Sequence, residues 1–159
     1  MKGKAITILI AIIAIVAIIG LAYLLRPQRF DTSFDSISIG YSGYAAPGID
    51  NTQTLQQQTY NIDESDPRLN TIKEILTRYP YHASIATLIH PGVMTWDSVT
   101  ETLLFSFDGP IGNIYLVNVS PWVSYGPRVY RIGWWGSVAS GKLFNEIKNV
   151  LDNNGGSAQ

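Results

Sequence analysis

An uncharged apolar run near the amino terminus constrains this chain more than any other feature. It extends from Ala5 to Leu25 without an Asp, Glu, Lys or Arg, and as an α-helix it would be about 31 Å long at ~1.5 Å per residue. That length matches the hydrocarbon core of one bilayer. Thr7, Gly20 and Tyr23 do not prevent insertion, because such residues bond within the helix or lie near an interface. We therefore predict a transmembrane anchor at residues 5–25, after a flank of residues 1–4.

Two other interpretations compete with the anchor. A cleaved secretory signal would use Lys2 and Lys4 as its basic region and Gly20-Leu21-Ala22 as its cleavage site. The apolar region of a signal normally spans about 7–15 residues, which is shorter than this run. A buried helix of a soluble core would be interrupted by polar residues at helical spacing, and this run is not. The length of the run favours the uncleaved anchor.

The charges beside the run bear on its orientation. The α-amine, Lys2 and Lys4 precede it, and Arg26 and Arg29 follow it, so the positive-inside rule only slightly favours a cytoplasmic amino terminus. A short flank before the helix and a long domain after it are typical of a signal-anchor. From Asp31 to Asp66 every charged residue is acidic, which does not oppose export. We predict a single-pass protein of the cell membrane with its C-terminal domain outside the cytoplasm.

The composition limits the chemistry that the chain can perform. Its 159 residues include no cysteine, which excludes disulfides, thiol catalysis, thiolate metal sites and a lipid-bearing cysteine. The net charge is −1, and Lys and Arg form no cluster along the chain. The electrostatic footprint of a nucleic-acid-binding protein is therefore missing. We expect the membrane, but no nucleic acid, among the partners.

The chain beyond the anchor has the size of one domain. We predict residues 26–34 as a linker, residues 35–151 as an extracytoplasmic α+β domain and residues 152–159 as a disordered polar tail. No cofactor is expected.

Two helices are predicted in the domain from capping residues and apolar spacing. Asp66 has the position of an N-cap and Pro67 the first helical position, which is typical of a helix start. Apolar residues then recur every three or four positions until Pro80, which ends the helix. A second amphipathic helix is predicted from Val138 to Leu151.

Strands are predicted where apolar residues alternate or gather between turn residues. These runs are "SISIGYS", "TLQQQTYNI", "HASIATLIH", "SVTETLLFSF", "NIYLVNV" and "RVYRIGWW". The segment Ser120–Pro127 between the last two runs is predicted as a loop. Short turns between runs favour antiparallel pairing, because parallel neighbours need a longer crossover. We expect an antiparallel sheet of about five to six strands with two amphipathic helices packed on it.

Candidates for metal binding have simpler explanations. His82 and His90 would be about 26 Å apart on an extended strand, so they cannot share an ion. Asp63, Glu64 and Asp66 lack the ligand spacing and central glycine of a calcium loop. Acidic residues at a helix start are explained by capping and by the helix dipole. We expect no metal site.

A glycine-punctuated segment before the last helix resembles a phosphate loop only superficially. It extends from Gly136 to Lys142, and Leu143 stands where such a loop needs the Ser or Thr that binds Mg²⁺. A connection that precedes the last helix explains it better.

Aromatic residues gather in the last third of the chain. Trp122 and Tyr125 lie in the predicted loop Ser120–Pro127, where large aromatics are unusual unless they pack or bind. Trp134 and Trp135 are adjacent, so in a strand they would point to opposite faces. Core packing explains much of this set, but Trp and Tyr are also enriched at interfaces. We predict Trp122, Tyr125, Trp134 and Trp135 as candidate partner-binding residues.

Three segments and the bare signal-anchor define the plan of the chain. The segments are the early strand "SISIGYS", the strand-to-helix unit "YNIDESDPRLNTIKEIL" and the closing strand and helix "VYRIGWW" and "KLFNEIKNVL". In this plan the chain resembles the small single-pass membrane-anchored proteins of uncharacterised function from Gram-positive bacteria. The resemblance implies this architecture and a location in the cell envelope, and it transfers no active residue.

The sequence thus predicts a membrane-tethered, non-catalytic domain that binds a cell-envelope component or a protein partner. One alternative is an immunity- or sensor-type membrane protein, whose partner would be a toxin or a signalling protein in the same membrane. The second alternative is a hydrolase without a recognised motif. Its residues would have to come from Asp97, Glu101, Asp108 and the two histidines.

Overall fold

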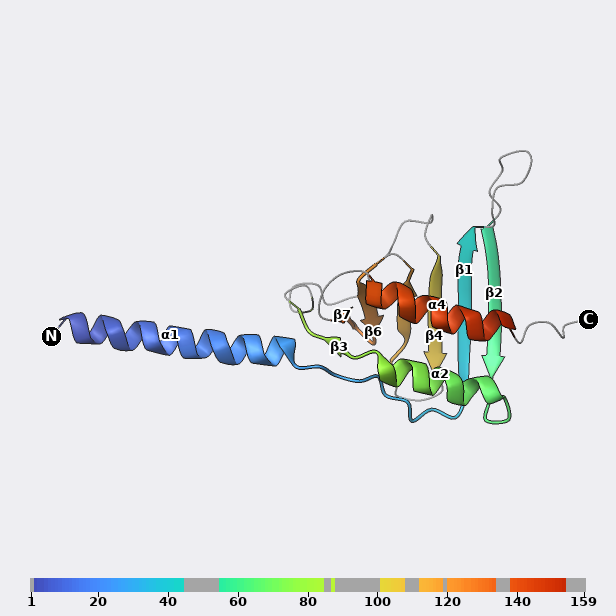
Figure 1. Cartoon of the computed structure of the whole chain (residues 1–159), viewed down its shortest axis with the longest axis horizontal. Coiled ribbons are helices and arrows are strands. Elements are labelled where there is room, and N and C mark those ends of the chain that lie inside the picture. Colours follow the sequence, from blue (N-terminus) through green and yellow to red (C-terminus); the bar gives the residue numbers. More distant parts are fainter. Residues whose placement is uncertain are drawn as a thin grey trace, which may run out of the picture.

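The apolar run forms one helix, α1 (Lys2–Leu25). In this computed structural model its segment Lys4–Leu24 has a mean hydropathy of 3.1, is long and apolar enough to span a membrane, and is 0% buried. Figure 1 shows α1 projecting away from the sheet and the other helices. The interpretation as a buried core helix is wrong, because a core helix is covered by its neighbours. A membrane span and a signal sequence both fit the helix.

The structure describes most of the chain beyond α1. The described residues are 2–44, 55–84, 87, 101–107, 112–118, 120–133 and 138–153. Several predicted residues lie outside these ranges, namely His90, Asp97, Asp108, Trp134 and Trp135. Most of the predicted tail lies outside them as well.

Seven strands form one sheet. They are β1 (Ile37–Tyr44), β2 (Leu55–Ile62), β3 (Tyr81–His82), β4 (Thr102–Phe107), β5 (Ile114–Val117), β6 (Trp122–Tyr125) and β7 (Arg128–Ile132). Their order across the sheet is β2-β1-β4-β5-β6-β7-β3, and every neighbouring pair is antiparallel. The predicted α+β class and antiparallel sheet are confirmed. The predicted number of five to six strands is wrong.

Strand β6 is the one that the sequence analysis missed. It lies inside the predicted loop Ser120–Pro127, and Tyr125 pairs with Arg128 across a turn of two residues. Gly126 has a φ of +56°, and proline holds φ of the next residue near −65°. That combination is a type II′ hairpin turn, in which glycine takes the first central position. Gly126 and Pro127 therefore mark a tight hairpin, and not the end of a long loop.

The strand predicted over His82–His90 is much shorter than expected. Strand β3 has two residues, Ala83 and Ser84 are in no strand, Thr87 is helical, and residues 85–86 and 88–90 lie outside the described part. The backbone N–H of Ser84 donates to Oγ1 of Thr87 at 2.9 Å. Such local side-chain bonds compete with strand pairing, which the alternating pattern did not reveal.

Helices α2 (Pro67–Arg78) and α4 (Val138–Asn153) cover one face of the sheet, as Figure 1 shows. Their buried apolar residues are Leu69, Ile72, Ile75, Leu76, Leu143, Phe144, Ile147 and Leu151. They pack on alternate residues of the central strands, including the fully buried Ile39, Leu103 and Phe105. Residues between these positions face the opposite side of the sheet.

The segment predicted as a linker, residues 26–34, contributes to this core. Phe30 and Phe34 are only 3% and 2% exposed. The Phe34 ring lies 4.6 Å from the ring of Phe107, and the ammonium group of Lys73 lies 5.0 Å from the Phe34 centroid. Two phenylalanines in a short polar segment produce no periodic pattern, so the sequence did not reveal their burial.

Asp66 caps α2 as predicted. Its carboxylate accepts a hydrogen bond from the backbone N–H of Arg68 at 2.9 Å and pairs with the Arg68 guanidinium at 2.6 Å. The hydrogen bond from the Arg68 side chain holds the pKa of the Asp66 carboxyl below its ordinary value of 3.8. The folded state therefore favours the ionised carboxylate more than the unfolded chain does.

This pKa predicts how stability depends on pH. Because the pKa of the Asp66 carboxyl is lower in the folded protein than in the unfolded chain, its ionised form stabilises the fold at pH values above the pKa in the unfolded chain. This stabilisation is lost as the pH falls through the pKa in the folded protein. We expect the free energy of unfolding of the natural chain to fall more steeply below about pH 4 than that of Asp66→Asn, which keeps a capping oxygen. Asp66→Ala also loses the cap, at a cost of about 1 kcal/mol near neutral pH. Urea unfolding in detergent at several pH values measures the pH dependence and the cost of losing the cap. If the free energy of unfolding fell equally steeply with pH in the natural chain and in Asp66→Asn, the predicted pH dependence would be contradicted.

Candidate functional site

Tyr125 lies in an aromatic cluster at the end of the sheet nearest α1. Its ring centroid is 5.5 Å from Phe30 and 5.5 Å from Tyr81, both edge-on. Tyr81 is in turn 4.8 Å from Phe30 and 4.7 Å from Tyr130. Each such pair contributes about 0.5–1.5 kcal/mol beyond the burial of its area. The Tyr125 hydroxyl also accepts a hydrogen bond from the backbone N–H of Asp31 at 3.3 Å. Tyr125 therefore holds the segment after α1 against the sheet.

Backbone pairing attaches the same segment to β3. The N–H of Gln28 donates to the carbonyl of Tyr81 at 2.7 Å, and the N–H of Tyr81 donates back at 2.9 Å. This is an antiparallel bridge on the outer side of β3. Only Arg26 and Pro27 separate Gln28 from the last residue of α1, a span of at most ~11 Å at ~3.6 Å per residue. The sheet is thus held close to the end of α1.

Trp122 lies on the other face of the sheet from Tyr125, because the two are an odd number of residues apart in one strand. It is half-buried, and the guanidinium of its strand neighbour Arg131 lies 5.8 Å from the Trp122 ring. The predicted pair Trp122 and Tyr125 therefore does not form one binding patch. Trp134 and Trp135, the other two candidates, are outside the described residues.

His82 is 8% exposed and neighbours Arg131 across the pairing of β3 with β7. Burial lowers the pKa of His82, and the nearby Arg131 charge lowers it further. A neutral imidazole at this position is consistent with a structural role.

Glu101, a residue of the hydrolase hypothesis, binds neighbouring strands. Its carboxylate accepts hydrogen bonds from the Tyr41 hydroxyl at 2.6 Å and from the side-chain amide of Asn118 at 2.7 Å. Burial, together with this hydrogen bond, raises the pKa of Tyr41. Four strand spacings of ~4.8 Å, about 19 Å, separate β4, which follows Glu101, from β3, which carries His82. The structure does not bring Glu101 and His82 together.

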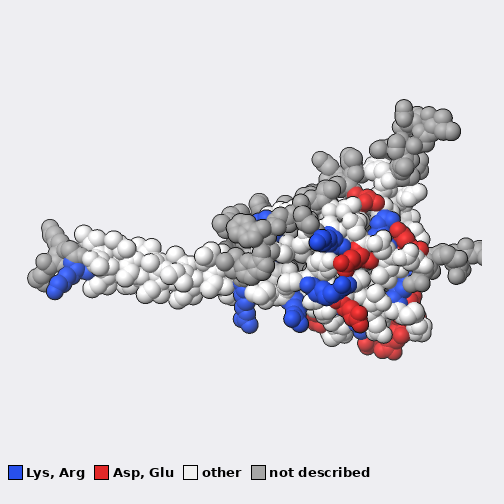
Figure 2. All heavy atoms as spheres, viewed as in Figure 1, with Lys and Arg blue, Asp and Glu red and all other residues white. Residues whose placement is uncertain are grey.

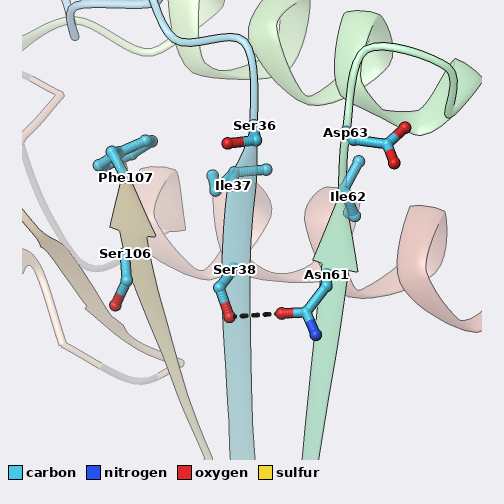
Figure 3. A pocket seen from close by; sticks show the side chains of 8 residues that line it. All are labelled: Ser36, Ile37, Ser38, Asn61, Ile62, Asp63, Ser106 and Phe107. Carbon is cyan, nitrogen blue, oxygen red and sulfur yellow. Dashed lines mark hydrogen bonds between the residues drawn. The ribbon is translucent and has the colours of Figure 1, made fainter. Parts of the chain in front are cut away.

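A hollow of about 330 Å³ lies at the ends of β1, β2 and β4. It is lined by Ser36, Ile37, Ser38, Asn61, Ile62, Asp63, Ser106 and Phe107. Figure 3 shows Ser38 bonded to Asn61, at 2.9 Å, while the Asp63 carboxylate points away from both. The Asp63 carboxylate accepts hydrogen bonds from the Ser65 hydroxyl and N–H, which lower the pKa of Asp63. The hollow can hydrogen-bond a small polar group, but the Asp63 carboxylate is already engaged with Ser65.

Two of the three acidic residues before α2, Asp63 and Asp66, make the local contacts of a helix start. Asp66 caps α2 and Asp63 closes the turn before it. Within the described ranges, no group of three or more His, Asp or Glu is placed to hold a metal ion.

A polar contact also joins the two covering helices, α2 and α4. Glu146 of α4 accepts hydrogen bonds from Arg78 at 2.9 Å and from the Tyr79 hydroxyl at 2.7 Å. Burial, with the bond to Glu146, raises the pKa of Tyr79 to about 12. Figure 2 shows basic and acidic side chains interspersed over this face of the molecule. The face therefore lacks the single-sign acidic surface that an immunity-type protein would favour.

Comparisons of the chain with family models, with curated proteins and with solved structures found no match.

The contacts of Tyr125 predict how firmly the segment after α1 is held. Tyr125→Ala removes the ring and is expected to lower the free energy of unfolding by about 3 kcal/mol. Tyr125→Phe removes only the hydroxyl and is expected to cost about 1 kcal/mol. Arg29 is exposed, but the backbone on both sides of it is held by the pairing of Gln28 and the burial of Phe30. Release of the segment frees this backbone, so trypsin should cleave after Arg29 faster in Tyr125→Ala than in Tyr125→Phe.

The matched control is Tyr44→Ala, which removes an aromatic ring at the far end of β1. Its cleavage after Arg29 is expected to match that of the natural chain. Equal cleavage in Tyr44→Ala and Tyr125→Ala would contradict a specific role of Tyr125 in holding the segment.

Proposed function

We propose that this chain is a single-pass membrane protein whose C-terminal domain lies outside the cytoplasm and binds another protein or an envelope component without catalysis. The observation that carries the proposal is the short connection between α1 and the sheet. Gln28 pairs with Tyr81 directly after α1, and Phe30 is buried beneath Tyr81 and Tyr125. Because the connection is short, the domain stays at the surface of the membrane that contains α1.

The use of the polar residues supports a binding role. Glu101 and Glu146 join strands and helices to one another, and His82 is buried beside a cation. Groups engaged in such structural contacts are poorly suited to proton transfer, which needs a carboxylate or imidazole within reach of substrate. The immunity-type alternative is less well supported, because the charges over α2 and α4 are mixed in sign.

The face of the sheet opposite the helices offers a surface for a partner. On β2 it carries the exposed side chains of Gln57, Thr59 and Asn61, and on β1 the half-buried side chains of Ser38 and Ser42. Uncharged amides and hydroxyls of this kind hydrogen-bond a polypeptide or a glycan without the cost of desolvating a charge. The overall plan also fits the resemblance to small envelope proteins of Gram-positive bacteria.

Protease treatment of intact cells tests the location. We expect an external protease to remove the domain while a membrane fragment keeps Met1 to Leu25, as read by mass. A cytoplasmic marker protein that stays intact is the control. Digestion only after lysis would place the domain in the cytoplasm and overturn the proposal. A mature chain that begins after Ala22 would identify a cleaved signal and overturn the anchor.

A further inference from the structure

The outer edge of β2 is the feature that the preceding description leaves without a role. Strand β2 ends the sheet, and it pairs with β1 along all eight of its residues without a bulge. Alternate residues of an edge strand direct their backbone N–H and C=O groups outward. From Leu55 to Thr59 every residue of β2 is exposed, so these groups are accessible to another chain.

This edge lacks the features by which proteins usually block strand addition. Its sequence, "LQQQTYNI", contains no Lys, Asp, Glu or Pro, whereas charged residues, prolines, bulges and short length normally protect an edge. The opposite edge is protected. Strand β3 has two residues, and the bridge from Gln28 covers its outer side. Among the described residues, one edge of the sheet is covered and the other is open.

We propose that the outer edge of β2 is a docking site for an extended segment of a partner protein, uncharged along its paired residues, which adds to the sheet as a further strand. This inference rests on the proposed binding function and specifies its surface. Main-chain hydrogen bonds to β2 supply the affinity, and alternate side chains supply the specificity. The exposed Gln57, Thr59 and Asn61 contact the alternate residues of the added strand.

The geometry of the anchor argues against a second copy of this chain as the occupant. Two identical antiparallel edge strands are related by a two-fold axis perpendicular to the sheet. Helix α1 leaves from the β3 side, about 29 Å from β2 at ~4.8 Å per strand, and Figure 1 shows α1 and β2 on opposite sides of the domain. Two copies joined through β2 would direct their α1 helices in opposite directions. They could not share one membrane.

The ends of β2 indicate the chemistry of the partner segment. Asp63 and Glu64 are exposed just beyond one end, so a Lys or Arg in the partner is favoured there. Leu55 is 48% exposed at the other end and offers contact to an apolar side chain. The predicted partner segment is therefore neutral along its strand, basic at one end and apolar at the other.

A peptide-binding experiment on the full chain in detergent tests this site. The probe is a fluorescent ten-residue peptide of alternating Thr and Val with one terminal Lys, and its affinity is measured by anisotropy. We expect binding, with increased hydrogen-exchange protection at alternate amides of β2. Gln57→Lys adds a charge to the open edge and is expected to weaken binding about tenfold, by the effect that protects natural edges.

Ser42→Lys is the matched control. Ser42 is the register partner of Gln57 on the neighbouring strand. Ser42→Lys therefore adds the same charge to the same face of the sheet, but away from the edge, and is expected to leave peptide binding unchanged. Equal losses in Gln57→Lys and Ser42→Lys would identify a site on the face and overturn the proposal. Absence of peptide binding, or a dimer of the chain that Gln57→Lys disrupts, would also overturn it. These outcomes are independent of the protease experiment, which decides the location.

Discussion

The backbone pairing of Gln28 with Tyr81 is the interaction on which the arrangement of this protein depends. Two hydrogen bonds, of 2.7 and 2.9 Å, join the chain that leaves α1 to the short edge strand β3. The pairing covers an edge of the sheet that would otherwise expose its backbone groups. It also directs Phe30 beneath the rings of Tyr81 and Tyr125. A single contact thus completes one end of the sheet and determines how far the sheet lies from α1.

The rest of the domain follows from two layers that share one core. Apolar stripes of α2 and α4 pack on alternate residues of the sheet, and the polar contacts of Glu101 and Glu146 tie strands and helices together at the margins. Among the carboxylates of the catalytic interpretation, only Glu101 lies in the part of the chain that the structure describes, and it is used for structure. Within the described residues, the polar face of β1 and β2 opposite the helices and the outer edge of β2 both suit association with another chain.

The sequence predicted elements whose signals are local. The length of the apolar run indicated α1, and Asp66, Pro67 and the apolar spacing after them indicated α2 at its observed position. The strand count was predicted less well. Gly126 and Pro127 were interpreted as loop residues because a two-residue hairpin turn and a loop end share the same residue types. Tyr125 is a candidate partner-binding residue, and its ring packs on Phe30, a residue of the predicted linker.

By itself, the sequence determined that the chain has an apolar helix long enough to span a membrane, amphipathic helices and strands that alternate. These properties depend on residues within a few positions of one another. Only the tertiary structure decided that residues 26–34 belong to the domain, that Tyr125 holds them, and that β2 is an open edge. The hydrogen bond from Asp31 to Tyr125 joins residues 94 positions apart. Contacts at such separations, and the order of strands in a sheet, have no local pattern from which they could be read.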